Sequence, residues 1–247
     1  MPTRVLLAAL AMSLAALAPA RAEPPCKGTP ASSSVVSAVR DGRTLILTDG
    51  REVRLAGIEA AADGTALRAL TAARSLRIAR VSDDRYGRVV AFAYDGETGE
   101  LLQTALLAGG EARVSARPGG KACAGLLLAA EKAARTARRG LWADPNFAPL
   151  SSENLTMLAA ARGQFALVEG QVLSVRESGA TIYVNFGRRW TRDFSVTIPK
   201  REARNFATAG IEPKALERRR IRVRGIIEQR GGPIIDVIAP EQIELID

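Results

Sequence analysis

The segment DGRTLILTDGREVRLAGIEAA, from Asp41 to Ala61, decides the fold of the first half of this 247-residue chain. Its apolar and polar residues alternate on either side of the turn-forming pair Asp49 and Gly50, which is the pattern of a β-hairpin. The two strands of the hairpin are predicted over Thr44–Thr48 and Glu52–Ile58. They make the first half of the chain rich in β-structure.

Further strands and helices are predicted around this hairpin. The strands cover Val35–Val39, Leu76–Arg80 and Val89–Tyr94, and the helices cover Asp63–Ala73, Leu101–Gly109 and Gly125–Arg139. The last helix ends in basic residues followed by Gly140, a common signal for a helix C-terminus.

The strand pattern restarts in the second half, over residues 163–247, after a stretch over 144–162 that we interpret as a linker. The predicted strands cover Phe165–Val175, Thr181–Phe186, Phe194–Pro199, Ile221–Gln229 and Ile234–Ile238, and a helix covers Lys200–Ala209. Three strands, a helix and two strands follow the order of an OB-fold, a small barrel often used to bind oligonucleotides or oligosaccharides. The second domain is therefore predicted to be OB-like.

Five motifs give the first half a family resemblance. They are DG-x-T at Asp41–Thr44, VRLAGIE at Val53–Glu59, DRYGR at Asp84–Arg88, LLAGGEARV at Leu106–Val114 and AARTARRGLW at Ala133–Trp142. Over residues 35–143 the chain resembles the staphylococcal nuclease-like (thermonuclease) family, whose core is an OB barrel with added helices. Both halves together predict a mainly β fold with flanking helices (α+β), built of tandem OB-fold-type barrels.

The resemblance also implies a functional site. Members of the family cleave phosphodiesters with one calcium ion, a carboxylate thought to act as general base, and two arginines that bind the phosphate. The arginines are present as Arg54 and Arg88, and the second metal ligand falls on Glu59. However, the first metal ligand falls on Arg43 and the general base on Ala62.

These replacements predict a protein that binds what its relatives cut. Calcium requires about six to eight oxygen ligands, and a lone Glu59 beside a cationic Arg43 makes a poor site for it. Losing a general base costs a further factor of about 10²–10⁴ in rate. We therefore expect no bound metal, and we expect Arg43, Arg54 and Arg88 to converge on a phosphate through paired hydrogen bonds, with Glu59 orienting one of them.

Three alternatives stay open from the sequence. A structural interpretation pairs Arg54 and Arg88 with Glu59 and Asp84 in a protein that has no binding site there. A catalytic interpretation keeps a calcium-dependent phosphodiesterase in which Asp63 replaces the lost base. In the third, the protein is an envelope scaffold for protein or polysaccharide, and its basic surface serves solubility alone.

The composition narrows the chemistry further. The chain has no histidine, which excludes a Ser-His-Asp triad, a Cys-His pair and nearly all zinc catalysis. Its 35 Lys and Arg against 26 Asp and Glu give a net charge of +9. This excess favours anionic partners, with nucleic acid the expected one.

A second candidate surface lies in the segment YVNFGRRWTRDF, which begins at Tyr183. On the predicted strand, Tyr183 points away from the apolar face of Ile182 and Val184, and Trp190 and Arg192 follow. Aromatic rings beside arginines can stack on bases and bind a nucleic-acid backbone. Tyr183, Trp190 and Arg192 are therefore predicted ligand residues. The alternative is that both rings pack inside the barrel or against the first domain.

The fourth predicted strand of this domain carries further charge. Arg222 and Arg224 alternate with the apolar Ile221 and Val223, so they point away from the core of the barrel. We expect them to lie on the ligand side of the sheet.

The N-terminal residues predict export from the cytoplasm. Arg4 precedes an apolar run of 13 residues and a small-x-small pattern, which together are typical of a signal peptide over residues 1–22. The run is shorter than the ~20 residues that span a bilayer, which disfavours a retained anchor. We therefore expect a periplasmic or secreted protein, with residues 23–34 as an extended lead-in.

The chain has two cysteines, Cys26 and Cys123. In an oxidising compartment an isolated pair is most simply a disulfide, which here would tie the N-terminal lead-in to the end of the first domain. The alternative is two buried free thiols.

Overall fold

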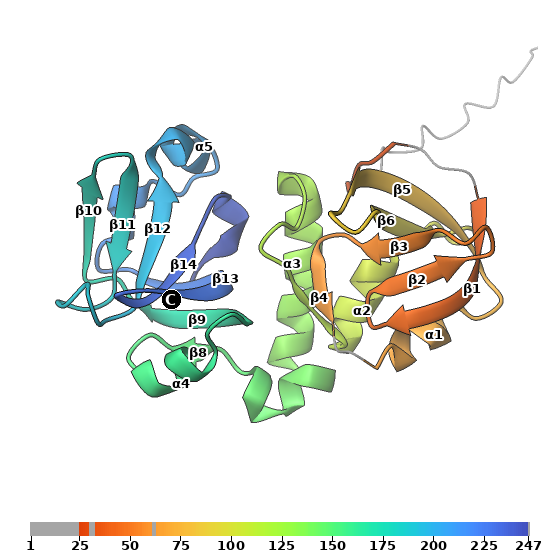
Figure 1. Ribbon diagram of the computed structural model, residues 1–247, viewed down its shortest axis with the longest axis horizontal. Helices are drawn as coiled ribbons and strands as arrows, with labels where there is room; N and C mark the ends of the chain where they lie inside the picture. Colours follow the sequence, from red (N-terminus) through yellow and green to blue (C-terminus); the bar gives the residue numbers. More distant parts are fainter. Residues whose placement is uncertain (1–24, 30–32, 61–62, 247) are drawn as a thin grey trace, which may run out of the picture.

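The computed structural model describes residues 25–29, 33–60 and 63–246. Two β-barrels lie side by side, and one long helix runs between them (Figure 1). The predicted signal peptide, residues 30–32 of the predicted lead-in and Ala62 lie outside the described residues. Within the part described, no helix is both long and apolar enough to cross a bilayer.

The first barrel is closed and has five strands. They are β1 (Ser33–Asp41), β2 (Thr44–Leu47), β3 (Glu52–Leu55), β5 (Ser75–Asp83) and β6 (Val89–Asp95). Their order around the barrel is β1-β2-β3-β6-β5, with β3 and β6 parallel and the other pairs antiparallel. The alternation of the predicted hairpin separates an inner from an outer face. Its apolar residues lie on the inner face and are buried in the core: Leu45, Leu47, Val53 and Leu55.

The long predicted strand over Glu52–Ile58 is divided. It breaks at Gly57, whose φ of +80° suits glycine and whose missing side chain leaves room for Leu127. Beyond the break, β4 (Ile58–Ala60) leaves the barrel and pairs with β7 (Ala112–Val114). This break directs the chain from β3 of the barrel towards the central helix.

Three helices accompany the first barrel. They are α1 (Thr65–Thr71), α2 (Leu102–Gly109) and α3 (Lys121–Thr136). The last begins four residues earlier than its sequence pattern predicts. It lies between the barrels (Figure 1), and its buried face includes Leu127, Glu131 and Ala134.

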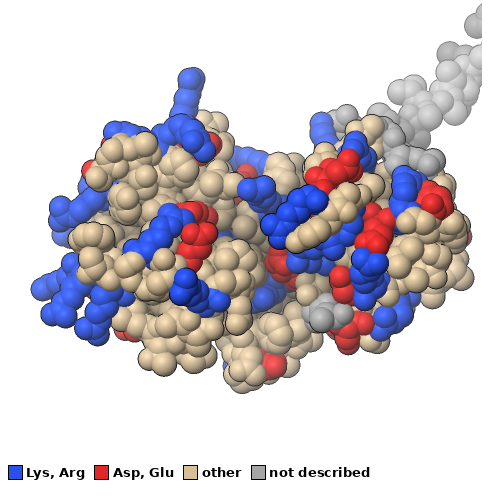
Figure 2. Space-filling view, in the orientation of Figure 1, with Lys and Arg blue, Asp and Glu red and all other residues tan. Residues whose placement is uncertain are grey.

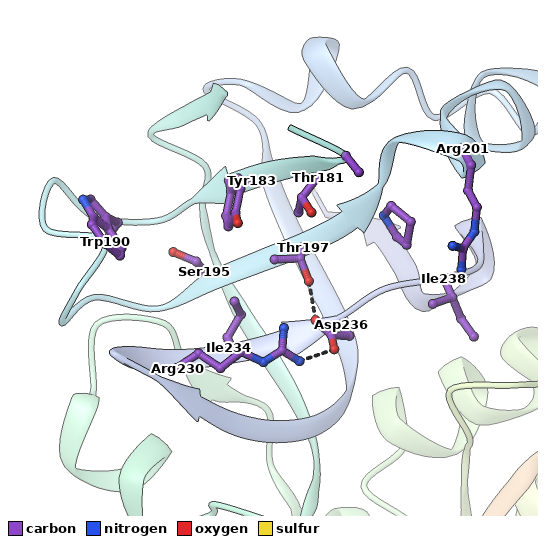
Figure 3. A pocket seen from close by; sticks show the side chains of 12 residues that line it. Thr181, Tyr183, Trp190, Ser195, Thr197, Arg201, Arg230, Ile234, Asp236 and Ile238 are labelled. Atoms are coloured by element: carbon purple, nitrogen blue, oxygen red, sulfur yellow. Dashed lines mark hydrogen bonds and ion pairs between the residues drawn. The ribbon is translucent and has the colours of Figure 1, made fainter. Parts of the chain in front are cut away.

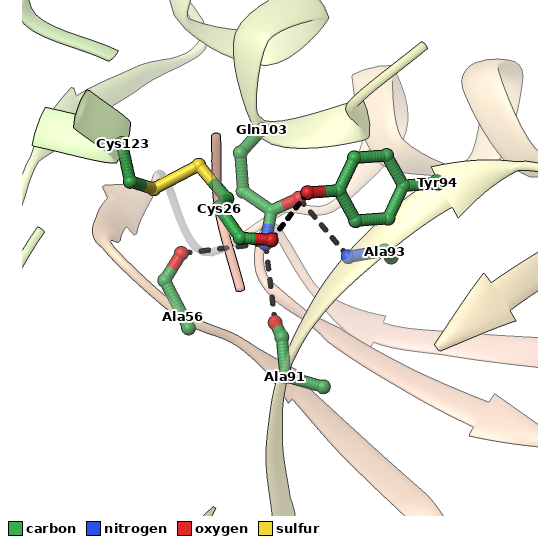
Figure 4. The surroundings of a disulfide bond; sticks show 7 residues. All are labelled: Cys26, Ala56, Ala91, Ala93, Tyr94, Gln103 and Cys123. Carbon is green, nitrogen blue, oxygen red and sulfur yellow. Dashed lines mark hydrogen bonds between the residues drawn. A yellow bond between two sulfur atoms is a disulfide. The ribbon is translucent and has the colours of Figure 1, made fainter. Parts of the chain in front are cut away.

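The predicted disulfide between Cys26 and Cys123 is present and joins the N-terminal segment to α3 across 97 residues of sequence (Figure 4). The hydroxyl of Tyr94 donates a hydrogen bond of 2.5 Å to the carbonyl of Cys26. The side chain of Gln103, fully buried, bonds the backbone of Ala56, Ala91 and Ala93. Polar groups in this part of the core are therefore paired.

The second barrel has the same strand order. Its strands are β9 (Phe165–Gln171), β10 (Ser174–Ser178), β11 (Thr181–Asn185), β12 (Ser195–Pro199), β13 (Arg220–Arg230) and β14 (Gly232–Asp236). They run in the order β10-β11-β12-β14-β13-β9, with β12 and β14 parallel. β9 and β10 together take the place of the first predicted strand of this domain. With the two counted as one strand, both barrels have the strand order of an OB-fold. The predicted fold class is confirmed.

Short elements complete the second barrel. They are β8 (Leu150–Ser151), α4 (Leu155–Ala160), α5 (Ala203–Thr208), β15 (Ile243–Leu245) and 3₁₀ turns at Lys200–Glu202, Pro213–Leu216 and Pro240–Gln242. Two further 3₁₀ turns, Gly140–Ala143 and Pro145–Phe147, follow α3. The stretch interpreted as a linker contains β8, which pairs with β9, and Leu158, which is fully buried in the second core. Much of this stretch is therefore packed on the second barrel.

A buried ion-pair network joins the two barrels. Arg224 on β13 and Glu131 on α3 both have fully buried side chains, and they form two hydrogen bonds of 2.9 and 3.3 Å. Arg224 also donates to the carbonyl of Val114 at 2.8 Å and to Glu244. Glu131 in turn accepts from Arg135 at 2.7 Å. Charges from both barrels thus pair with one another in the interface, and of the Arg224 guanidinium only Nε is without a hydrogen-bond partner among the described residues.

The predicted ligand-facing role of Arg222 and Arg224 is therefore wrong. Arg222 pairs with Glu169 and Glu244, with side-chain exposure of only 12%. Both arginines do point away from the core of their own barrel, as the alternation requires, but α3 and β15 cover that face.

Candidate functional site

The three predicted arginines come from adjacent parts of the first barrel. Arg43 lies in the turn between β1 and β2, Arg54 is central in β3, and Arg88 immediately precedes β6. Strand register places Arg54 opposite Thr44 on one side and Val90 on the other. Because Val53 and Leu55 point into the barrel, Arg54 points out of it and remains half-buried.

Arg43 is held by the backbone and by Glu59. Its Nη1 donates to the carbonyl of Ile58 at 3.1 Å, and the same guanidinium forms an ion pair with Glu59. Its backbone N–H donates to Asp41 at 2.9 Å. Glu59 therefore orients Arg43, and Arg43 stands against the carboxylate that the family resemblance assigns to metal binding.

Arg88 is held by the turn that precedes it. Its Nε donates to Asp84 at 2.7 Å, and its guanidinium lies 5.2 Å from the centre of the Tyr86 ring. Loss of solvation opposes the ionisation of Asp84, but hydrogen bonds from Arg88 and from the backbone of Tyr86 outweigh it and lower the pKa of Asp84. The Asp84 pairing is the one that the structural interpretation expects.

Arg54 differs from its two neighbours. Within the part of the chain that the structure describes, its side chain has no hydrogen bond and no ion pair. Partial burial lowers the pKa of Arg54, and the positive charges of Arg43 and Arg88 lower it further. The negative charges of Glu59 and Asp41 act in the opposite direction. The structure thus brings all three guanidinium groups into one electrostatic neighbourhood.

The residues of this site do not fit a calcium ion. Glu59 is engaged by the guanidinium of Arg43, which occupies the side where a cation would bind. Asp63 is exposed and accepts from the backbone N–H of Thr65 at 3.3 Å. Among the described residues, no three His, Cys, Asp or Glu side chains are grouped to hold a metal. The donor set suits an anion.

A depression of about 530 Å³ lies beside this site. Of the three arginines, Arg88 lines it. Its other lining residues are Arg40, Gly50, Arg51, Glu52, Tyr86 and Gly87. Tyr86, whose ring is largely exposed, was not predicted from the sequence, although its place in the DRYGR motif beside Arg88 could have indicated it.

The second barrel carries a cleft of about 420 Å³ (Figure 3). Its lining residues come from β11, β12, the end of β13, β14 and the loops beside them: Ala180, Thr181, Tyr183, Trp190, Ser195, Thr197, Pro199, Arg201, Arg230, Ile234, Asp236 and Ile238. It brings together the predicted Tyr183 and Trp190, while the predicted Arg192 lies on the same loop as Trp190 but does not line the cleft.

The floor of this cleft includes polar residues that sequence reasoning missed. Tyr183, Thr197 and Asp236 are neighbours in one cross-strand row, and Asp236 accepts from both Thr197 and Arg230 (Figure 3). No sequence motif marks Asp236 or Thr197, and strand register alone places them beside Tyr183. Asn185, two residues beyond Tyr183 on β11, is buried and accepts a hydrogen bond from Ser195.

Comparison with known proteins identifies the first barrel. Residues 53–144 match the family model described as "Staphylococcal nuclease homologue". The match begins within β3 and runs past α3, so it includes Arg54, Glu59 and Arg88, whereas β1, β2 and Arg43 precede it. A search of curated proteins found no significant match to the chain. The staphylococcal nuclease-like resemblance of the first half is confirmed.

Proposed function

We propose that this protein, which contains a staphylococcal nuclease-like domain, binds nucleic acid or another phosphate-bearing anion through Arg43, Arg54 and Arg88 and does not cleave it. The observation that carries the proposal is the position of Arg54. Its half-buried guanidinium is subject to the positive charges of Arg43 and Arg88, and no described carboxylate forms an ion pair with it. A phosphate would relieve the mutual repulsion of these charges.

The donors left by the protein's own contacts support this function. Arg88 uses Nε for Asp84, and Arg43 uses Nη1 for Ile58 and Glu59. Their remaining guanidinium donors, and all five of Arg54, make no hydrogen bond to the residues described. Guanidinium groups bind phosphate oxygens in pairs, so three of them can hold one or two phosphates of a chain.

The same contacts argue against hydrolysis. A calcium-dependent reaction needs the metal to polarise the phosphate and a base to activate water. Glu59 is neutralised by Arg43, and Ala62 has no proton-accepting group. Asp63, the candidate substitute base, is exposed and turned to the backbone of its own helix. These features favour binding over catalysis.

The contacts of the arginines also bear on the structural and scaffold interpretations. The purely structural interpretation accounts for Arg88 through Asp84, but Glu59 pairs with Arg43 and leaves Arg54 unexplained. The scaffold interpretation gives these arginines no role in partner binding. The proposed site of action is the periplasm or the extracellular space, an oxidising compartment that suits the Cys26–Cys123 disulfide.

Replacement of Arg54 tests the proposal. We expect Arg54→Ser to weaken binding of a fluorescent single-stranded oligonucleotide by about ten-fold or more, and to reduce the slope of log affinity against log salt by about 1. Fluorescence anisotropy at several salt concentrations measures both quantities.

Arg77→Ser is the matched control, because it removes the same charge from an exposed position on β5 of the same barrel. It should change affinity much less than Arg54→Ser. Equal effects of the two variants would mean that net charge, rather than the three-arginine site, determines binding.

A further inference from the structure

The cleft of the second barrel combines a conspicuous aromatic ring with a basic loop. Residues 187–193 connect β11 to β12 and carry Trp190, which is 69% exposed. From these features we propose that the cleft binds an unpaired base of a single-stranded nucleic acid, which stacks on Trp190 and Tyr183 while the loop arginines contact the backbone phosphates. This second site is separate from the three-arginine site, and either can exist without the other.

The loop that carries Trp190 is folded by its own hydrogen bonds. The carboxylate of Asp193 accepts from the backbone N–H of Arg189 at 2.8 Å, and the backbone N–H of Asp193 donates to the carbonyl of Arg189 at 2.7 Å. Phe186 and Phe194 close its base, with ring centres 5.0 Å apart. These contacts hold the backbone of the loop around Trp190 in one conformation, which reduces the backbone entropy lost on binding.

A second loop supports the first. The turn between β13 and β14 passes so close to it that a side chain at Gly232 would meet the backbone of Arg192 and Asp193 at 3.0 Å or less. Two loops and the sheet face of β11, β12 and β14 thus form the walls and floor of the cleft (Figure 3). Such a built cleft differs from a single apolar residue exposed by chance.

The aromatic residues provide the stacking surfaces. Tyr183 stands on the floor, in register with Thr197, and Trp190 stands at the rim (Figure 3). Ile234 and Ile238 add apolar surface to the lining of the cleft. The site can hold one flat, partly apolar ring and satisfy its polar edge from Thr197 and Asp236.

The charges near the cleft select the ligand. Arg188, Arg189 and Arg192 are exposed, and their side chains have no hydrogen bond or ion pair with any residue in the described ranges. Figure 2 shows a group of basic side chains at the end of the second barrel where this loop lies. The cleft's own carboxylate, Asp236, is already paired with Arg230. The excess is positive, as a phosphate backbone requires.

Charge also separates nucleic acid from a neutral oligosaccharide. Both ligands can stack on tryptophan and tyrosine, but a neutral sugar gains nothing from three unpaired guanidinium groups. A strand with a base over Trp190 and phosphates on either side of it uses both features.

Tryptophan fluorescence gives the direct test. Trp190 and the buried Trp142 are the only tryptophans, so Trp142→Phe leaves Trp190 as the single emitter. In this background we expect oligo-dT to quench the emission. Adding Trp190→Ala, followed by anisotropy of labelled oligo-dT, should weaken binding by about ten-fold, whereas Trp190→Phe should retain most of it.

The controls separate this site from nonspecific attraction and from the first barrel. Met157→Ala removes another exposed apolar side chain, from α4 of the same barrel, and should leave binding unchanged. The quench should persist in Arg54→Ser, so its presence there would support this site even if the three-arginine site fails. An abasic oligomer that quenches as well as oligo-dT, or a neutral oligosaccharide that quenches in its place, would overturn the proposal.

Discussion

Replacing Arg224 by methionine is expected to lower the free energy of unfolding by about 3–5 kcal/mol. The substitution leaves the fully buried Glu131 with one cationic partner, Arg135, and deprives the carbonyl of Val114 of its donor. Removing one member of a buried ion pair leaves a charge that water cannot solvate. Urea unfolding monitored by circular dichroism measures the loss.

Arg220→Ser provides the matched control for this prediction. Arg220 lies on the same face of β13, but its side chain is 63% exposed, and its ion pair with Glu169 is long at 3.9 Å. Its loss should therefore cost less than about 1 kcal/mol. The double variant Arg224→Met, Glu131→Gln should lose less unfolding free energy than the sum of the losses of the two single variants, because neither buried charge is then left without its partner. A loss for Arg224→Met no larger than the Arg220→Ser loss would refute the structural role given to the network.

The network also gives the interface a dependence on pH. Burial opposes the ionisation of Glu244, but the charges of Arg224, Arg135 and Arg222 outweigh it and lower its pKa below the ordinary 4.5. A carboxyl group whose pKa is lowered by folding stabilises the protein above its unfolded pKa. This stabilisation is lost as the pH falls from about 4.5 through the lower folded pKa. Arg224→Met should make this part of the acid sensitivity smaller.

Restoring two acids in the first barrel should create a nuclease activity. Arg43→Asp removes the cation from Glu59 and provides a second carboxylate for calcium, and Ala62→Glu provides a base. A base alone contributes a factor of about 10²–10⁴, so the double variant should gain calcium-dependent cleavage where the unaltered protein has none. A fluorogenic oligonucleotide with calcium or with a chelator measures it.

The comparison for this gain is Arg40→Asp with Ala62→Glu. Arg40 is also a barrel arginine, but it pairs with Glu52 and should not contribute to a metal site. That variant should remain inactive. If the unaltered protein already cleaves with calcium, and the acids at positions 43 and 62 change the rate little, another set of residues performs catalysis.

The sequence predicts local structure well, and it also predicts a pairing that has a single solution. Alternation places Val53 and Leu55 inside the barrel and Arg54 outside it, and the isolated cysteines pair as expected. These predictions succeed because they depend on strand periodicity and on a pairing with a single solution.

The sequence does not predict what covers each outward face. The alternation that turns Arg222 and Arg224 away from their own core is the same as that of a ligand-facing residue. In the structure, however, Arg224 pairs with Glu131 of α3, and Arg222 pairs with Glu169 and Glu244. Likewise, Thr197 and Asp236 join Tyr183 only through strand register, and Gly232 meets the Trp190 loop across about forty residues of sequence. Contacts between segments distant in sequence determine these outcomes.

A salt titration of the protein, expressed from residue 23, against fluorescent single-stranded DNA tests the central claim most directly. Binding and cleavage are followed together, with calcium and with a chelator. We expect binding that does not depend on calcium, with a log affinity that falls linearly with log salt, and we expect the DNA to stay intact. Calcium-dependent cleavage, or binding that is absent or insensitive to salt, would contradict it.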